Sequence, residues 1–274
     1  MYTVRRKGFA MSESAVEPLT AGKREVIVTL TSYGQRVEDM LPYALYSLMN
    51  QTVKPNRILL WLDNEHWNDN NLPVVIKQFV KHGLEVRYCE DIRSYKKLIP
   101  TIETFPNAIY ITADDDIYYK KTMVGELVEA WEINPRSLHA FRANSPTFTD
   151  TGALRSYSQW KIEVPAGTPA PVFPTSGGGV AYTRELLYAD VCRQDLFLEL
   201  SPLADDVWLY FMTILNHTPI DVLGSTYGTS LDILYRRNPR NASLQKQNMG
   251  MGMNDVQIQN VMNYYGLSTE DLCR

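Results

Sequence analysis

The sequence has few cysteines, no excess of positive charge and no long apolar run. Its three cysteines, Cys89, Cys192 and Cys273, have a spacing that matches neither a zinc site nor a disulfide framework. The formal net charge is -4, whereas a general nucleic-acid-binding protein is usually basic. Nucleic acid is therefore not an expected partner.

Segments that would cross a membrane are also missing. No apolar run approaches the ~18 residues of a transmembrane helix. The basic residues at 5–7 are not followed by the apolar run of a signal peptide. Together with the cysteine usage, this predicts a cytoplasmic protein that is soluble or peripheral to a membrane. At 274 residues with 45% hydrophobic and 21% charged content, the chain can bury a full globular core.

Strand-like and helix-like segments alternate along the first half of the chain. Nearly continuous apolar or β-branched runs predict strands, and segments with helical periodicity lie between them. The expected strands are residues 26–30, 57–62, 84–88 and 109–112, and the expected helices include 37–50 and 72–82, the latter closed by Gly83. This order predicts an α/β fold with a mostly parallel central sheet flanked by helices.

The second half is less regular but continues the same pattern. The expected elements are a helix at 122–134, strands at 138–142, 180–183 and 219–223, a helix at 184–191, a helix opening at Asp205, and a terminal helix near Asn254. Between them lie an irregular stretch at 143–174, a basic cluster at 236–240 and a loop of alternating Met and Gly at 248–254. We therefore expect a loose leader at 1–24, one domain at 25–223, and an extension at 224–274 packed on that domain.

Three adjacent carboxylates, Asp114, Asp115 and Asp116, follow the predicted strand at 109–112. Such groups repel one another unless a cation or a set of donors compensates for them. Mg²⁺ and Mn²⁺ prefer oxygen ligands, commonly one or two carboxylates plus phosphate oxygens. Ligands of open α/β sheets bind beyond the carboxyl ends of strands. The cluster therefore favours a site for a divalent cation and a phosphate, with a solvated turn neutralised by the lysines at 120–121 as the alternative.

Two further motifs follow in the second half. Gly177, Gly178 and Gly179 precede a short apolar strand, and such a run allows close backbone approach to a ligand. A flexible hinge is the alternative. Asp205 and Asp206 open a helix, where acidic residues are also ordinary capping residues.

The order of these motifs resembles that of GT-A fold glycosyltransferases that use nucleotide sugars. A first strand ends in a polar turn, a second in Asp63 and a fourth in the Asp cluster, and a glycine-rich strand and an acidic pair follow. The resemblance spans roughly residues 25–223, and its most specific segments are 112–116 and 203–208. In this respect the chain is similar to glycosyltransferase family 2 and to bacterial cell-surface polysaccharide transferases.

The resemblance implies a metal site at the Asp cluster. In such transferases an Asp-any-Asp motif binds Mn²⁺ or Mg²⁺, and Asp114 and Asp116 match its two ends. A metal at this place stabilises the charge of the departing nucleoside diphosphate. No third ligand is evident from the sequence. His217 is the candidate, although a lone histidine is more often structural.

The resemblance also implies a donor site, with a UDP-sugar as the expected donor. The turn after the first strand and Asp63 would hold the nucleoside, and a lysine at 96 or 97 would suit a diphosphate as a point charge. The turn lacks the proline common in family 2, so the preference for nucleotide and sugar stays open. The expected donor-binding residues are Thr31, Ser32, Tyr33, Arg36, Asp63, Lys96, Lys97, Asp114, Asp115, Gly178 and Gly179.

An inverting transferase needs a carboxylate that removes the proton from the acceptor hydroxyl. The family places this base at an acidic pair that opens a helix, so Asp206, with Asp205 beside it, is the expected catalytic residue. The resemblance implies a glycan or lipid-linked glycan acceptor in lipopolysaccharide or capsule synthesis, at the inner face of a membrane. Trp160 and Tyr157 are expected to stack on the acceptor, and a loop with its own small core is the alternative.

Two other functions fit part of the pattern. A sugar nucleotidylyltransferase also combines an α/β sheet with metal-binding carboxylates, but it usually has a glycine-rich basic loop after the first strand. Residues 31–36 contain a single glycine, and the P-loop pattern is absent from the chain. A non-catalytic relative that binds nucleotide sugars also stays open, although both acidic motifs keep their carboxylates.

Overall fold

The computed structural model describes residues 20–21, 24–224, 228–230 and 252–273. The expected basic cluster at 236–240, nearly all of the leader and most of the Met-Gly loop lie outside these residues. Within the described part of the chain, no helix is both long and apolar enough to cross a bilayer.

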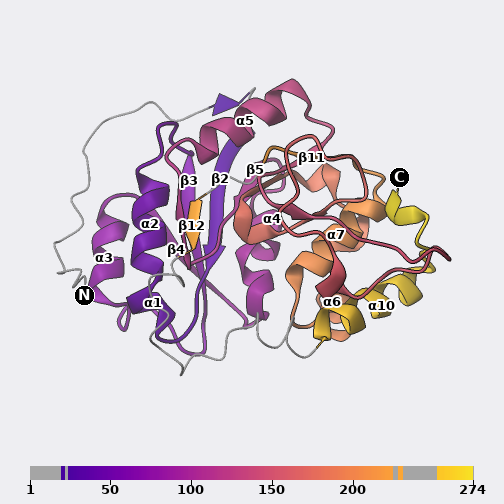
Figure 1. Ribbon diagram of the computed structural model, residues 1–274. Coiled ribbons are helices and arrows are strands. Elements are labelled where there is room, and N and C mark those ends of the chain that lie inside the picture. Colours follow the sequence, from indigo (N-terminus) through magenta and orange to yellow (C-terminus); the bar gives the residue numbers. More distant parts are fainter. Residues whose placement is uncertain (1–19, 22–23, 225–227, 231–251, 274) are drawn as a thin grey trace, which may run out of the picture.

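An eight-stranded sheet lies at the centre of the molecule (Figure 1). Seven strands follow the order β11-β7-β10-β5-β2-β3-β4, and the short β1 pairs with β2. Along this order β10 is antiparallel to both of its neighbours, and every other pair is parallel. The strands are β1 Thr20–Ala21, β2 Arg24–Thr31, β3 Arg57–Asp63, β4 Leu84–Cys89, β5 Ile109–Thr112, β7 Leu138–Ala140, β10 Val180–Tyr182 and β11 Ile220–Val222.

Both faces of this sheet are buried, which explains the near-continuous apolar runs in its parallel strands. In β2, Val26, Val28 and Leu30 belong to one hydrophobic core, whereas Ile27 belongs to a second core on the opposite face. The expected α/β class with a mostly parallel sheet flanked by helices is confirmed.

The helices form two layers, one on each face (Figure 1). The first layer contains α1 Arg36–Asp39, α2 Leu41–Met49, α3 Val74–Lys81 and α5 Met123–Ile133, and the second contains α4 Ile99–Thr104, α6 Gln194–Leu200, α7 Asp205–Leu215 and α10 Met253–Tyr265. Gly83 follows α3 with a φ of +100°, as its expected position after a helix end requires.

Two expected helices differ from those in the structure. The segment predicted at 37–50 is broken at Met40 into α1 and α2. The helix predicted at 184–191 is wrong, because this segment forms two short 3₁₀ turns, η4 Arg184–Leu186 and η5 Ala189–Cys192. Leu186 and Val191 still point into the core. Apolar spacing alone does not distinguish a helix from consecutive turns that bury the same residues.

Short elements fill the stretch predicted as irregular at 143–174. It contains the strands β8 Ala143–Asn144 and β9 Phe173–Pro174, which pair with each other, and the 3₁₀ turn η2 Tyr157–Gln159. A second small sheet pairs β6 Ile117–Tyr119 with β12 Gly228–Ser230. The remaining 3₁₀ turns are η1 Arg93–Lys97, η3 Ser176–Gly178 and η6 Asp271–Cys273.

The strand order reverses beside β2. The chain moves outward from β2 to β3 and β4, then returns to place β5 on the other side of β2. In open α/β sheets, ligands bind outside the carboxyl ends of the two strands that flank such a reversal. These ends are Thr31 and Thr112. The polar turn after β2 and the Asp cluster after β5 therefore meet at the position where a ligand site is expected.

Candidate active site

The turn after β2 binds the middle carboxylate of the Asp cluster. Ser32 Oγ donates to Asp115 Oδ2 at 2.5 Å, and Arg36 Nε donates to both Asp115 oxygens at 3.0 and 3.1 Å. Arg36 Nη2 also lies 2.8 Å from Asp116 Oδ2. Asp115 is buried, and both of its carboxylate oxygens accept hydrogen bonds from other residues of the protein. Asp115 thus holds the two loops of the crevice together.

Lys97 connects the Asp cluster to the later acidic pair. Its Nζ donates to Asp114 Oδ1 at 2.6 Å and to Ser176 Oγ at 2.9 Å, and it lies 3.1 Å from Asp205 Oδ2. The two carboxylate oxygens are therefore at most about 5.7 Å apart, which is the sum of their distances to Nζ. Burial opposes the charge of Lys97, but the surrounding carboxylates hold its pKa well above the ordinary value.

The glycine-rich segment packs directly against these residues. A Cβ on Gly177 would lie 1.9 Å from Asp114 Oδ2, and one on Gly178 would lie 2.4 Å from Arg142 Cβ. Gly179 has a φ of +92°, a left-handed conformation that favours glycine. Gly177 is therefore needed for close packing on Asp114, and Gly178 for close packing on Arg142.

The acidic pair at the start of α7 is held by the turn before β10. The Ser176 amide donates to Asp206 Oδ1 at 2.7 Å, and Ser176 Oγ donates to Asp205 Oδ2 at 3.2 Å. Burial, followed by the neighbouring charge of Asp205, raises the pKa of Asp206 to about 6. A carboxylate with this pKa is suited to general base catalysis near neutral pH.

The site has more negative than positive charge. The five carboxylates at 114–116 and 205–206 face Arg36 and Lys97, and Arg142 also acts on Asp114. Burial, followed by the charges of Asp114 and Asp115, raises the pKa of Asp116 to about 6. Asp114 differs, because burial opposes its ionisation but the charges of Lys97, Arg36 and Arg142 together lower its pKa.

This excess charge and the all-oxygen donor set fit a hard divalent cation. The side chains of Asp114 and Asp116 are 36% and 23% exposed, so both are open to an incoming ion. Within the described ranges, no three His, Cys, Asp or Glu residues form a ready-made metal cluster. The residues therefore suit an ion that takes one or two carboxylates and completes its shell with phosphate oxygens.

His217 is not brought to these carboxylates. It follows α7, whereas Asp205 and Asp206 begin that helix. Eleven helical residues place the two ends roughly 16 Å apart at the rise of an α-helix. His217 is also exposed. It also precedes β11, which runs in the same direction as β5, so it lies at the edge of the sheet opposite Asp114 and Asp116, the ligands with which it was expected.

Asp63 and Lys96 form a second group at the ends of β3 and β4. Asp63 Oδ1 accepts from the His66 amide at 2.9 Å and lies 2.6 Å from His66 Nδ1, while Lys96 pairs with Asp91. Adjacent lysines thus have different partners, since Lys97 faces the acidic motifs. Cys89 lies between these charges, and burial is the main cause that raises its pKa to about 11.

The remaining expected donor residues lie at the end of β2. Thr31 Oγ1 donates to the Trp61 carbonyl at 2.8 Å. Tyr33 is 43% exposed, and its ring lies 5.4 Å from the Arg36 guanidinium carbon. Tyr33 is therefore an exposed aromatic side chain close to Asp115 and Asp116.

Sequence reasoning missed Ser176 and Tyr119. Ser176 contacts Lys97 and both members of the acidic pair. The Tyr119 hydroxyl accepts from the Asp114 amide at 2.7 Å and donates to the Gly177 carbonyl at 2.7 Å. The position of Ser176 directly before the glycine run could have indicated that it belongs to the site. Nothing in the sequence indicated the partners of Tyr119.

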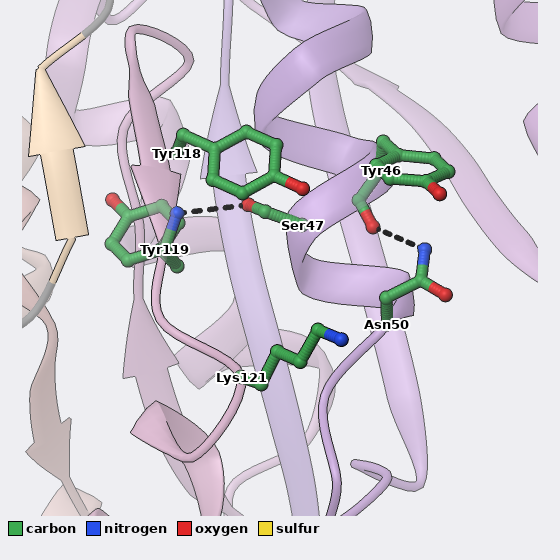
Figure 2. A pocket seen from close by; sticks show the side chains of 6 residues that line it. All are labelled: Tyr46, Ser47, Asn50, Tyr118, Tyr119 and Lys121. Carbon is green, nitrogen blue, oxygen red and sulfur yellow. Dashed lines mark hydrogen bonds between the residues drawn. The ribbon is translucent and has the colours of Figure 1, made fainter.

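A pocket of about 140 Å³ lies against the other side of Tyr119 (Figure 2). In this pocket Ser47 Oγ accepts from the Tyr119 amide at 3.0 Å. Tyr119 therefore belongs both to this pocket and, through its hydroxyl, to the candidate active site. The pocket is lined by Tyr46, Ser47, Asn50, Tyr118, Tyr119 and Lys121.

The expectation that Trp160 faces the acceptor is wrong. Trp160 is buried, and its ring lies 4.7 Å from Tyr157 and 5.4 Å from Phe173 between centroids. The stretch thus has the small aromatic core that was the alternative. Tyr157 differs, because Asp206 is near enough to add to the burial that raises its pKa to about 12. Its ring also lies 5.7 Å from that of Phe173 between centroids, three residues before Ser176, whose amide donates to Asp206.

Comparison with solved structures found many similar chains, including the two named below. No protein-family model matches the chain, and no curated protein sequence matches it. The two structures are of Staphylococcus aureus TarS residues 1–349, one in complex with UDP and one without it. Each is 13% identical and covers 89% of this chain and 72% of the other, with TM-scores of 0.48 and 0.47.

Proposed function

We propose that the chain is a glycosyltransferase that moves a sugar from a nucleoside-diphosphate donor to a hydroxyl of a glycan or lipid-linked glycan. The observation that carries this proposal is the pairing of two acidic motifs in the crevice where the strand order reverses. Lys97 brings oxygens of Asp114 and Asp205 within about 5.7 Å, the sum of its two contact distances. One motif therefore serves the leaving diphosphate, and the other serves the attacking hydroxyl.

At the Asp cluster, Asp114 and Asp116 would hold Mn²⁺ or Mg²⁺ together with phosphate oxygens of the donor. Such an ion supplies Lewis-acid stabilisation of the leaving group. The residues of the chain do the rest. Arg36 and Ser32 fix Asp115 and thereby the loop that carries the two ligands. The exposed Tyr33 ring, close to Asp115 and Asp116, is available to the nucleobase of a UDP-sugar.

Asp206 would remove the proton from the acceptor hydroxyl as that oxygen attacks the anomeric carbon. The Ser176 amide orients its carboxylate, and its raised pKa makes it a better proton acceptor than an ordinary aspartate. Attack from the side opposite the leaving diphosphate inverts the anomeric configuration. Surface polysaccharide, such as lipopolysaccharide or capsule, is the acceptor class that we propose, with the enzyme working at the inner membrane face.

A thermal-shift screen of nucleoside diphosphates with and without Mn²⁺ tests the donor site. A ligand that binds only the folded state raises Tm, by the equivalent of about 2.7 kcal/mol at one hundred times its Kd. We expect UDP with Mn²⁺ to raise Tm, EDTA to cancel the effect, and Asp116→Ala to abolish it. Asp195→Ala is the matched control, because Asp195 is an exposed carboxylate of α6 whose side chain pairs with the exposed Arg193 just before that helix.

Asp206→Asn separates binding from catalysis in the same screen. The asparagine keeps an oxygen for the Ser176 amide but cannot accept the acceptor proton. We expect the UDP-dependent shift to remain and sugar transfer to fall by about 10²–10⁴-fold. Transfer that equals the wild-type rate would refute the base assignment. A chain that responds to no nucleoside diphosphate would favour a non-catalytic relative instead.

A further inference from the structure

The first two turns of α10 bind two segments, one that leads into the acidic pair and one that carries Tyr157. Asp255 Oδ2 accepts from Ser156 Oγ at 2.7 Å, and Asp255 Oδ1 accepts from the Tyr157 amide at 2.6 Å. Two residues later, Gln257 Oε1 accepts from the Leu203 amide at 2.7 Å. Hydrogen bonds to a charged acceptor are stronger than neutral ones. Asp255 therefore fixes the start of η2 firmly.

Both bound segments are connected to α7, the helix that begins with the acidic pair. Leu203 lies two residues before Asp205 and leads into α7. Tyr157 is packed against Trp160 and Phe173, and Phe173 in turn lies 4.9 Å from Tyr210 of α7 between ring centroids. The Tyr157 hydroxyl accepts from Asn144 Nδ2 at 3.0 Å. Tyr157 is therefore held both by the packing of its ring and by the hydrogen bond to its hydroxyl.

Gln257 has no exposed surface, and its Nε2 donates to the Met253 carbonyl at 3.1 Å. A buried amide with both ends bonded has a fixed orientation. The helix that carries it packs on α6 and α7 within the same core. α10 therefore acts as a rigid spacer between the Tyr157 segment and the segment that leads to the acidic pair.

We propose that Asp255 and Gln257 are positioning residues for the acceptor, because they set the gap between the Tyr157 ring and the Asp206 carboxylate. This inference rests on the proposed function, in which Asp206 receives the acceptor proton. An acceptor sugar would pack on the Tyr157 ring while its hydroxyl reaches Asp206. The donor site, held by Arg36, Ser32 and Asp115, does not depend on α10.

Asp255→Asn tests the proposal through two separate substrates. The variant keeps the size of the side chain but replaces one acceptor oxygen by an amino group, so one of its two contacts is lost. We expect the KM for an alkyl glycoside acceptor, from a panel of octyl glucoside, galactoside and N-acetylglucosaminide, to rise about tenfold or more. This corresponds to about 1.4 kcal/mol or more. The Kd for UDP with Mn²⁺ and the slow hydrolysis of the donor should stay within about twofold of wild type.

Asp271→Asn is the matched control, because Asp271 also accepts from a serine hydroxyl and a serine amide, both of Ser268 at 2.8 Å, in the C-terminal η6 turn. We expect no change in the KM for the alkyl glycoside there. Ser156→Ala removes the Asp255 contact from the other side and should raise that KM in the same direction. Equal losses of UDP affinity and acceptor affinity in Asp255→Asn would show a general structural defect and overturn the proposal.

Hydrogen–deuterium exchange gives a readout that needs no substrate. In Asp255→Asn the peptide covering 153–160 should exchange faster, while peptides from β2 and β3 keep their protection. Unchanged exchange at 153–160 would overturn the positioning role whatever the activity. If wild-type protein binds no nucleoside diphosphate and transfers no sugar, the proposed function fails. The exchange result then decides by itself whether Asp255 holds the Tyr157 segment.

Discussion

Asp206 is half-buried next to the buried Asp205, and this environment disfavours its negative charge. Burial and the adjacent carboxylate raise its pKa to about 6, although Lys97 and the Ser176 donors oppose the shift. A raised pKa means that the folded protein holds this proton more tightly than the unfolded chain does. Ionisation of Asp206 at higher pH is thus unfavourable for folding. The site keeps a group whose ionisation costs stability, which is common at catalytic positions.

The pH dependence of transfer follows from the same group. A general base must be ionised, so kcat/KM should fall as pH drops through about 6, the raised pKa of Asp206. At lower pH the protonated carboxyl cannot accept the hydroxyl proton. The measurement is a pH profile of transfer from about pH 5 to pH 8, with UDP affinity followed in parallel. A transfer rate that stays constant across that range would contradict the assignment of Asp206 as base.

For single residues, the sequence indicated which residue types belong to the site but not which side chain each of them contacts. The carboxylates at 114–116 and 205–206 were recognisable because they follow a strand and open a helix. Lys96 and Lys97 were indistinguishable, since both are lysines in one short segment. Their partners, Asp91 and Asp114, are set by the 3₁₀ turn η1, which directs consecutive side chains apart. Such a difference of direction has no signal in composition or spacing.

Among the elements, the η3 turn fits most tightly into the site. Its three residues, Ser176–Gly178, connect Lys97, Asp114 and the acidic pair. The parallel strands β2, β3, β4 and β5 were predictable, because residues buried on both faces give long apolar runs. The antiparallel direction of β10 was not, because direction depends on how the chain returns to the sheet. Apolar patterning is the same in either direction.

Replacement of Gly177 by alanine tests the role of this turn. The new Cβ would lie 1.9 Å from Asp114 Oδ2, so the carboxylate or the turn must move. We expect the Mn²⁺-dependent Tm increase with UDP to be lost or strongly reduced, because Asp114 and its contact to Lys97 are displaced. The measurement is the same thermal-shift assay, with and without UDP and Mn²⁺.

Gly152→Ala is the control for this variant. Gly152 has a φ of +81° and nothing within 4 Å of an added Cβ. It therefore reports the backbone strain of alanine alone, which is about 1 kcal/mol. If Gly177→Ala kept the full response to UDP and Mn²⁺, close packing of this turn on Asp114 would not be needed for donor binding.

At the scale of the whole molecule, the two cores on either side of the sheet are built from different parts of the chain. One core is completed by α2, α3 and α5, whereas the other combines α4, α6 and α7 with the late helix α10. The acidic pair begins α7 and the Asp cluster follows β5. The sequence predicted the sheet that joins these layers. It also predicted a terminal helix in an extension packed on the domain, but the weakly apolar α10 sequence did not indicate which of the two cores this helix would join.

Ile258→Ala tests whether α10 is an integral part of that core. Ile258 is 3% exposed, beside fully buried Val261, so its truncation should cost roughly 2–5 kcal/mol in free energy of unfolding. Val256→Ala on the same helix is the control, since Val256 is 50% exposed and should cost little. Both are measured by urea unfolding, followed by tryptophan fluorescence and far-UV circular dichroism.

If α10 folds together with the sheet, Ile258→Ala moves one shared transition to lower urea, and the two probes coincide. The fluorescence should report this transition because Trp208 of α7 lies 6.3 Å from Tyr265 of α10 between ring centroids. If α10 were a loosely attached extension, the variant would instead show a separate early loss of helix, and the main transition would stay at its wild-type midpoint. That outcome would also remove the rigid spacer on which Asp255 and Gln257 depend. Acceptor positioning and global stability are therefore tested by neighbouring residues of one helix.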